Sequence, residues 1–299
     1  MIFPRLTVDA VNRAVTTLDG AAGKSVNVAK VLKTLGQHPL ATGFLGGQRG
    51  EQVRALLVAR GIKVDFVMVD SPTRQCITVI DESARTHTEL VEESCPVTKA
   101  DYERLMKIIR RSVKGCRAVV MSGTITPGGP SNFYFECAKL AREAGAFAVV
   151  DAQGAALLAA LKAGPELVKP NRAELAVTMG RKVTLEAAAM SAMRGLCERG
   201  AKRVIVTAGQ DPTLAYDGRN FWKIRSPRIA AINPIGSGDA FTAGLVWRLV
   251  RGDDLGEACR WASATAAANA LTPMPGEVNR ADVERLARAI KVRQVLLPH

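Results

Sequence analysis

Short apolar runs alternate with stretches of helical periodicity along most of the chain. The apolar runs predict strands at Ala41–Leu45, Ala118–Ser122, Ala146–Ala152, Leu167–Lys169 and Arg203–Ala208. Apolar positions at helical spacing predict helices at Ser25–Leu35, Glu51–Arg60, Thr98–Val113, Ser131–Glu143 and Leu185–Arg199. Because the runs are apolar on both faces, they are typical of strands buried in a parallel sheet. The alternation therefore predicts βαβ units and a doubly wound α/β sheet flanked by helices.

Two stretches break this alternation. Leu6–Leu18 and Val64–Val91 have the pattern of consecutive extended segments without helices between them. Strands outside any βαβ unit are expected to form a small antiparallel sheet of their own, such as a lid. After Ile232 the pattern becomes mostly helical, with helices predicted at Ser237–Val250, Leu255–Ala270 and Arg280–Val292. We therefore expect a core domain of residues 19–63 and 96–299 and a lid of residues 1–18 and 64–95.

The composition is that of an ordinary globular protein. Of 299 residues, 47% are hydrophobic and 23% charged, and no window approaches the roughly 18 apolar residues of a membrane span. The first residues lack the apolar region of a signal peptide, so we expect a cytoplasmic protein without a membrane partner. Six scattered cysteines without C-x-x-C spacing favour small core residues over disulfides, and three dispersed histidines do not suggest a metal site.

The formal charge of +13 admits two interpretations, a nucleic-acid surface or a protein that handles several phosphates. The basic residues are spread along predicted helices rather than gathered in a tail, and few aromatic residues are available to stack on bases. This distribution favours a solvated basic surface that attracts small anions. We expect no nucleic-acid partner.

A glycine-containing turn precedes the first of the late helices. The string Gly236-Ser237-Gly238-Asp239-Ala240-Phe241 leads into an apolar helical face. Glycine lets the backbone turn sharply, and unpaired N–H groups of residues 236–239 at a helix N-terminus would form an anion site. An aspartate here can simply complement the helix dipole. Beside an anion site, however, the Asp239 carboxylate can accept the proton of an attacking hydroxyl, as in phosphoryl transfer.

This string resembles the second signature of the ribokinase-like (pfkB) carbohydrate kinases. Residues 22–29, Ala-Gly-Lys-Ser-Val-Asn-Val-Ala, and the later Gly43-Phe44-Leu45-Gly46-Gly47 resemble the first. The similarity covers nearly the whole chain and is strongest to the branch with 1-phosphofructokinase, tagatose-6-phosphate kinase and the minor 6-phosphofructokinase. It implies a Rossmann-like, mostly parallel sheet with a small β-sheet lid that can pair into a homodimer. It also implies ATP and Mg²⁺ as cofactors, with Gly236, Ser237, Gly238 and Asp239 as the catalytic residues.

The resemblance also implies a sugar-phosphate site. Its residues are Gly23, Lys24, Asn27, Arg74, Ser122 and Thr124. Arg74 matches a lid arginine that meets the substrate phosphate, and a guanidinium suits that task because it binds phosphate through two parallel hydrogen bonds. Asn27 offers both a donor and an acceptor to sugar hydroxyls.

The resemblance also implies a nucleotide site, in which this sequence departs from the family pattern after Gly209. Its residues are Lys169, Asn171, Glu174, Thr207, Gly209, Ala266 and Asn269. Asn171 and Glu174 match an Asn-x-x-Glu motif that organises Mg²⁺ through water, and the same spacing forms a helix capping box. Both roles can hold at once. After Gly209 the family usually has a second glycine, where this chain has Gln210-Asp211-Pro212.

The beginning of the chain departs from the family pattern. Family members start with a core strand that ends in an Asn/Thr-Pro-x-x-Asp turn, whose aspartate holds sugar hydroxyls. Here residues 6–13 already resemble the lid strands that follow, and Asp9 is not at the matching position. We therefore expect that strand and its aspartate to be missing from this sequence.

These observations lead to one expected function and several alternatives. We expect an ATP-dependent kinase that phosphorylates a hydroxyl of a sugar phosphate, with fructose-1-phosphate as the first candidate. Tagatose-6-phosphate kinase is the alternative among enzymes. A nucleoside or unphosphorylated-sugar kinase would leave Arg74 without a phosphate. A catalytically weak binder of nucleotide or sugar phosphate is the alternative of a different class.

Overall fold

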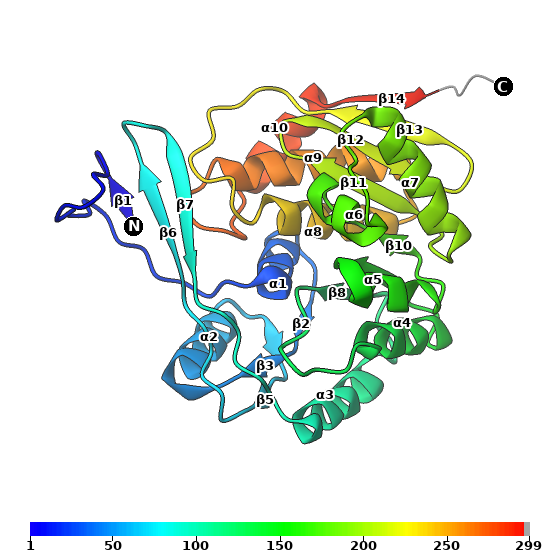
Figure 1. The fold of residues 1–299 in the computed structure, drawn as a ribbon, viewed down its shortest axis with the longest axis horizontal. Helices are drawn as coiled ribbons and strands as arrows, with labels where there is room; N and C mark the ends of the chain where they lie inside the picture. The colour runs from blue at the N-terminus through cyan, green and yellow to red at the C-terminus, as the bar shows by residue number, and fades with distance from the viewer. Residues whose placement is uncertain (296–299) are drawn as a thin grey trace.

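The computed structural model describes residues 1–295, which are built around a seven-stranded sheet (Figure 1). Its strands, in spatial order, are β14 (Lys291–Val295), β13 (Phe221–Arg225), β12 (Asp211–Tyr216), β11 (Val204–Ala208), β10 (Leu167–Val168), β9 (Phe147–Asp151) and β8 (Ala118–Ser122). Strands β8 to β11 are parallel, and β11 to β14 are antiparallel. The predicted parallel core is therefore present, with an antiparallel extension that the sequence pattern did not indicate.

Helices cover both faces of this sheet. One face packs against α4 (Phe133–Glu143), α5 (Gly154–Leu161), α6 (Arg172–Met179) and α7 (Glu186–Glu198). The other face packs against α8 (Ser237–Leu249), α9 (Leu255–Ala270) and α10 (Arg280–Ala289). Successive strand residues alternate between the two cores, as Val149 and Val150 do in β9. This alternation of buried residues is why the central strands are apolar on both faces.

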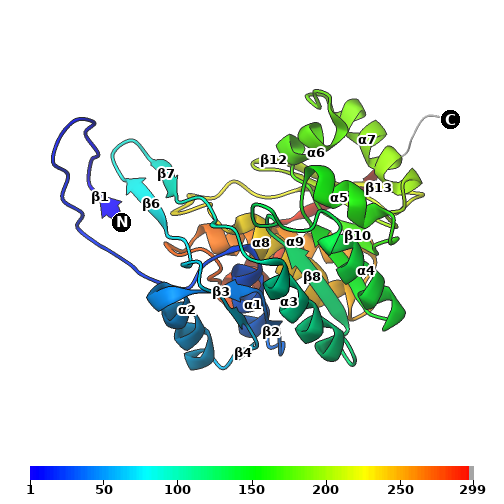
Figure 2. The same ribbon diagram turned by 60° about the horizontal axis from the view of Figure 1, so that its bottom comes forward.

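The first helices lie at the β8 end of the sheet. Helix α1 (Lys24–Thr34) packs on α8 and β8, and α2 (Gly47–Ala59) and α3 (Lys99–Ser112) lie beyond it (Figure 2). The predicted strand Ala41–Leu45 is divided in the structure, because Gly43, at a φ of 151°, interrupts it. The resulting short strands form two parallel pairs, β2 (Leu40–Ala41) with β4 (Lys63–Val64) and β3 (Phe44–Leu45) with β5 (Val67–Met68).

A separate three-stranded sheet forms the lid. It consists of β1 (Ile2–Phe3), β6 (Cys76–Asp81) and β7 (Thr86–Val91), and it stands away from the core in both views (Figures 1 and 2). The predicted extended segments in Leu6–Leu18 are wrong, because this stretch has only one isolated β-bridge, from Thr16 to Ile2. Strands β4 and β5 pair outside the lid sheet. The second chain segment of the lid sheet therefore begins at Cys76, later than the predicted boundary at residue 64.

Another sequence prediction needs correction. The last helix ends at Ala289, and residues 291–295 form the edge strand β14 instead of the predicted last helical turn. Among the described residues, the seven-stranded sheet ends at β8, and β1 belongs to the lid sheet. Asp9 lies in an exposed turn with a φ of 58°.

The close approach of α8 and α9 gives a testable prediction. A Cβ at Gly244 would lie 2.5 Å from Thr265 Oγ1 and 3.0 Å from Ala262 Cα. Since both are fixed in the facing helix, we expect Gly244→Ala to destabilise the fold by about 1–3 kcal/mol in denaturant unfolding. The control is Gly195→Ala in α7, where the new Cβ would be 3.6 Å from Met179 Cε and should stabilise the helix. Equal effects of the two substitutions would contradict the tight packing.

Candidate active site

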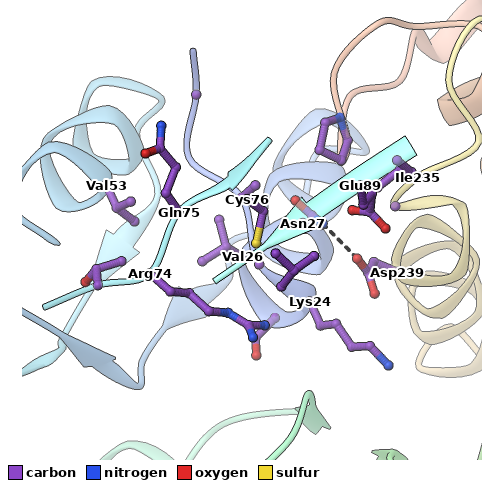
Figure 3. A pocket seen from close by; sticks show the side chains of 18 of the residues that line it. Lys24, Val26, Asn27, Val53, Arg74, Gln75, Cys76, Glu89, Ile235 and Asp239 are labelled. Atoms are coloured by element: carbon purple, nitrogen blue, oxygen red, sulfur yellow. Dashed lines mark hydrogen bonds between the residues drawn. The ribbon is translucent and has the colours of Figure 1, made fainter. Parts of the chain in front are cut away.

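A cavity of about 980 Å³ lies between the lid and the carboxyl ends of the core strands. Loops at the carboxyl ends of parallel strands are where such sheets bind ligands. Figure 3 shows the walls from the start of α1, the turn before α8 and the lid, and the ends of β9 and β10 also line the cavity. Segments far apart in the chain therefore meet at one place.

The glycine turn forms one wall. Gly236 is the N-cap of α8 and has a left-handed φ of 81°. This φ disfavours any residue with a side chain. In addition, a Cβ at this position would lie 2.8 Å from Pro275 Cβ. The backbone N–H groups of Gly236, Gly238 and Asp239 have no hydrogen-bond partner within residues 1–295. The prediction for Ser237 needs correction, because its N–H donates to Pro234 O at 3.1 Å.

Asp239 stands beside these amides. The residue is only 7% exposed, yet it lines the cavity. Asn27 Nδ2 donates to Asp239 Oδ2 at 2.7 Å, as the dashed line in Figure 3 shows. Burial raises the pKa of Asp239 from 3.8 to about 6, and Asp151 adds to the rise, whereas Asn27, Lys169 and Lys24 oppose it. Such a carboxyl is still ionised at neutral pH and binds a proton far better than an ordinary aspartate.

A buried ion pair lies next to Asp239. Lys169 Nζ is 3.1 Å from Asp151 Oδ2, and both side chains are 3% exposed. Thr242, one turn after Asp239 in α8, donates to the same Asp151 oxygen at 3.0 Å. Sequence reasoning missed Asp151. Its position at the end of a buried strand was the available signal.

Lys24, at the start of α1, forms an ion pair with Glu174 in the first turn of α6. Its Nζ lies 3.2 Å from Glu174 Oε1. Burial works against its charge, but the carboxylates of Asp151, Glu174 and Asp239 raise its pKa above the ordinary value. Glu174 also completes the predicted capping box at the start of α6, where Asn171 Oδ1 accepts from Glu174 N at 2.9 Å and Glu174 Oε2 accepts from Asn171 N at 2.8 Å.

The lid contributes an arginine and a contact with the core. Arg74 is exposed, lines the cavity and points into it from the segment before β6 (Figure 3). The neighbouring Thr73 is anchored to Gly46, whose N–H donates to Thr73 Oγ1 and whose carbonyl accepts from Thr73 N, both at 2.9 Å. On β7, His87 Nε2 lies 2.6 Å from Ile232 O. These contacts hold the lid over the cavity.

The sequence pattern of the pfkB family carbohydrate kinases matches residues 2–280. The chain belongs to the pfkB family. It is therefore a carbohydrate kinase, an enzyme that transfers a phosphoryl group to a sugar, and the predicted ribokinase-like α/β fold is confirmed.

Solved structures of pfkB relatives share this fold. Phosphofructokinase-2 from Escherichia coli, in complex with fructose-6-phosphate, is 26% identical, with 96% of this chain and 93% of that chain covered and a TM-score of 0.86. A possible 1-phosphofructokinase from Thermotoga maritima is 25% identical, with 99% and 95% covered and a TM-score of 0.91. The Escherichia coli enzyme has also been solved with potassium and in a tetrameric inhibited form.

Most of the residues predicted from the pfkB signatures come together at the cavity. The predicted residues that line it are Gly23, Lys24, Asn27, Arg74, Lys169, Asn171, Glu174, Thr207, Gly236, Gly238 and Asp239. Ser122, Thr124, Gly209 and Ala266 do not line it among the described residues. The Ser122 hydroxyl is buried and has no hydrogen-bond partner within this part of the chain.

The predicted adenine contact of Asn269 is replaced by a structural one. This side chain is fully buried, and Asn269 Nδ2 donates to Ile235 O at 2.9 Å and to Ser237 Oγ at 3.3 Å. Asn269 Oδ1 accepts from Gly276 N at 2.8 Å. A buried amide with all these partners cannot turn towards a nucleotide without leaving polar groups unpaired. Asn269 therefore supports the glycine turn from behind.

Residues 1–295 hold no group of three or more His, Cys, Asp or Glu side chains that could bind a metal ion. None of the helices in this range is long and apolar enough to cross a membrane.

The raised pKa of Asp239 predicts a pH-dependent effect on stability. An acid whose pKa is higher in the folded state stabilises the fold below its unfolded pKa and loses that contribution as the pH rises through the folded pKa. Relative to the wild type, Asp239→Asn should gain up to about 3 kcal/mol in unfolding free energy between about pH 4 and pH 7. Denaturant unfolding at several pH values measures this. Asp254→Asn, at the N-cap of α9 outside the cavity, is the control. A difference in unfolding free energy between Asp239→Asn and the wild type that stays constant with pH would contradict the raised pKa of Asp239.

Proposed function

We propose that this kinase transfers the γ-phosphoryl group of ATP to a hydroxyl of a sugar phosphate, with fructose-1-phosphate as the leading acceptor. The observation that carries the proposal is the placement of one buried carboxylate, Asp239, in a cavity that the lid arginine Arg74 enters, beside amides that, like this arginine, have no partner within residues 1–295. The similarity to a phosphofructokinase-2 solved with fructose-6-phosphate and to a possible 1-phosphofructokinase supports a phosphorylated acceptor.

Asp239 is the proposed base. The acceptor oxygen forms a bond to the γ-phosphorus, the bond from that phosphorus to the ADP oxygen breaks, and the hydroxyl proton passes to the Asp239 carboxylate. A base is most effective when its pKa is near the working pH, and burial moves the Asp239 pKa in that direction. The free amides of Gly236, Gly238 and Asp239 face the charge on the transferred group. Asn27 fixes the orientation of the carboxylate through its donated hydrogen bond.

The sugar phosphate is proposed to lie between α1 and the lid. Arg74 has no ion-pair partner within residues 1–295, so its guanidinium remains available for a phosphate. Gly23 and Lys24 stand at the N-terminus of α1, where the helix dipole favours an anion. Ser122 and Thr124 would contact the substrate only after a local shift, since neither lines the cavity as described.

The nucleotide is proposed to bind at the other end, where Lys169, Thr207 and Gly209 would meet its phosphates. Asn171 and Glu174 would hold Mg²⁺ through water. Their position fits this task, because both line the cavity and their partners leave oxygen lone pairs for water. When bound, Mg²⁺ would neutralise charge on the ATP phosphates. Ala266 is proposed only as a weaker contact with adenine.

We also propose that the protein acts in the cytoplasm and forms a homodimer through its lid. The lid carries exposed apolar residues, among them Leu90 and Val91, on the strand that ends the sheet. An edge strand has unpaired backbone groups that can pair with another copy. The tetrameric form of the Escherichia coli relative shows that one pfkB kinase assembles, which makes assembly of this chain worth testing.

The test of the acceptor is a kinase assay across fructose-1-phosphate, tagatose-6-phosphate, fructose-6-phosphate and unphosphorylated fructose. We expect the highest kcat/KM with fructose-1-phosphate. Arg74→Met should raise the KM for the phosphosugar by about 10–100-fold, since a charge-assisted bidentate bond contributes about 1.5–3 kcal/mol, and should leave the KM for ATP unchanged.

Arg54→Met is the matched control, because Arg54 is an exposed α2 arginine outside the cavity that pairs with Glu51. A preference for tagatose-6-phosphate would replace the leading acceptor. Binding of ATP and sugar phosphate without turnover would identify a binding protein and overturn the proposed function. An equal effect of Arg74→Met on phosphorylated and unphosphorylated acceptors would refute the role of Arg74.

The proposed base is tested by Asp239→Asn. We expect turnover to fall by about 10³-fold or more, because the amide cannot accept the proton and a general base contributes about 10²–10⁴-fold. Thermal unfolding should show an intact fold, and Asp254→Asn should keep wild-type kinetics. Turnover of Asp239→Asn within a few-fold of the wild type would exclude Asp239 as the base.

A further inference from the structure

Lys30, in the second turn of α1, holds a buried ammonium group outside the cavity. Its side chain is only 2% exposed. Nζ donates to Ala21 O at 2.9 Å and to Pro275 O at 2.8 Å, and it lies 3.1 Å from Glu277 Oε1. A lysine is almost never this buried unless its charge is paired. All three of its donors have a partner here.

These partners belong to two segments that are far apart in the chain. Ala21 lies in the loop that leads into the N-terminus of α1, and Pro275 and Glu277 lie in the loop between α9 and α10. Glu277 is itself held by Arg60, which donates to Glu277 Oε1 and Oε2 at 2.5 and 2.9 Å. The ammonium therefore fastens the α9–α10 loop to the beginning of α1.

The other side of the α9–α10 loop touches the glycine turn. Pro275 packs so closely that a Cβ on Gly236 would be 2.8 Å from Pro275 Cβ. Gly276 N donates to Asn269, whose amide in turn donates to Ile235 O and Ser237 Oγ. The loop thus supports the turn by direct contact and through one buried amide.

The same loop also touches the partner of Asp239. Gly276 has a φ of 71°, and a Cβ there would lie 2.8 Å from Asn27 Cα and 2.9 Å from Asn27 Oδ1. Asn27 donates to Asp239 and is itself buried, at 4% exposure. A displacement of residues 275–276 would therefore disturb both the amides and the carboxylate orientation.

We propose that Lys30 is a positioning residue for phosphoryl transfer, which sets the glycine turn and the Asn27–Asp239 pair through the α9–α10 loop. The inference rests on the proposed roles of Gly236 and Asp239. Lys30 does not line the cavity, so it acts through the loop and not on a substrate. A merely structural role would lower stability and the amount of active enzyme. A positioning role lowers kcat in fully folded enzyme.

The experiment compares Lys30→Met, Lys30→Arg and the control Lys33→Met in the full chain. Lys33 is another α1 lysine, and within residues 1–295 no hydrogen bond or ion pair joins its side chain to the α9–α10 loop. We expect Lys30→Met to lower kcat by about 10²-fold while both KM values change by less than about threefold, the size expected when reacting groups are misplaced by about 1 Å. Lys30→Arg should recover most of kcat, and Lys33→Met should match the wild type.

Hydrogen exchange without substrates supplies a second readout. Peptides that cover residues 234–239 and 273–277 should exchange faster in Lys30→Met, while those in α7 should not change. If Lys30→Met does not fold, Glu277→Gln takes its place. This substitution removes the carboxylate that pairs with Lys30 and leaves the hydrogen bonds from Lys30 to the carbonyls of Ala21 and Pro275. A smaller fall in kcat, about 3–10-fold, with the same local increase in exchange is then expected.

Several results would overturn the inference. These are wild-type kcat in folded Lys30→Met, wild-type kcat and exchange in Glu277→Gln, or exchange that rises evenly over the whole chain. Failure of the proposed function is recognised separately, because it appears as absent turnover of every sugar phosphate by the wild type. In that event the exchange data still decide whether Lys30 holds the loop against the glycine turn.

Discussion

The hydrogen bond from Asn27 to Asp239 is the constraint around which the active site is organised. It joins the first turn of α1 to the first turn of α8, helices that begin more than 200 residues apart in the chain, and it exists only if both helices start at the same point in space. Gly23 and Gly236 cap these helices with positive φ angles, which lets each backbone turn abruptly into its helix. Since α6 also begins at the cavity, the N-termini of three helices border it and contribute partial positive charge there.

Two carboxylates share this site in different environments. Asp151 has a lysine at 3.1 Å and a hydroxyl donor, so its charge is neutralised within the core. Within residues 1–295, the Asp239 carboxylate accepts a side-chain hydrogen bond only from the Asn27 amide and pairs with no lysine or arginine, and burial raises its pKa to about 6. The two carboxyl groups therefore differ in their partners, and the proposed base is the one that has no ion-pair partner within residues 1–295.

The sequence predicted what is encoded locally and missed what depends on packing. The parallel strand Ala118–Ser122 and the helix Leu255–Ala270 have the predicted bounds because each carries its own apolar pattern. The turn at Gly236 was visible because only glycine suits its backbone. Strands β12 and β13 were missed because they follow β11 as a meander, without the helices that signal βαβ units. The contacts of Asn269 and Lys30 were not predictable, because their partners lie in segments that only the folded chain brings together.

The proposed base and the proposed phosphate-binding arginine belong to different parts of the fold. The proposed base, the free amides and the loop that supports them all belong to the core, where tight packing around Gly236 and Gly276 allows little variation. Arg74 instead comes from the segment before the lid hairpin, which is tied to the core at few points, such as Thr73 with Gly46 and His87 with Ile232. A substitution at the lid can therefore alter the proposed contact of Arg74 with the acceptor without disturbing the carboxylate. Because exposed lid positions bear less packing constraint than the core, specificity within this family is expected to vary there first.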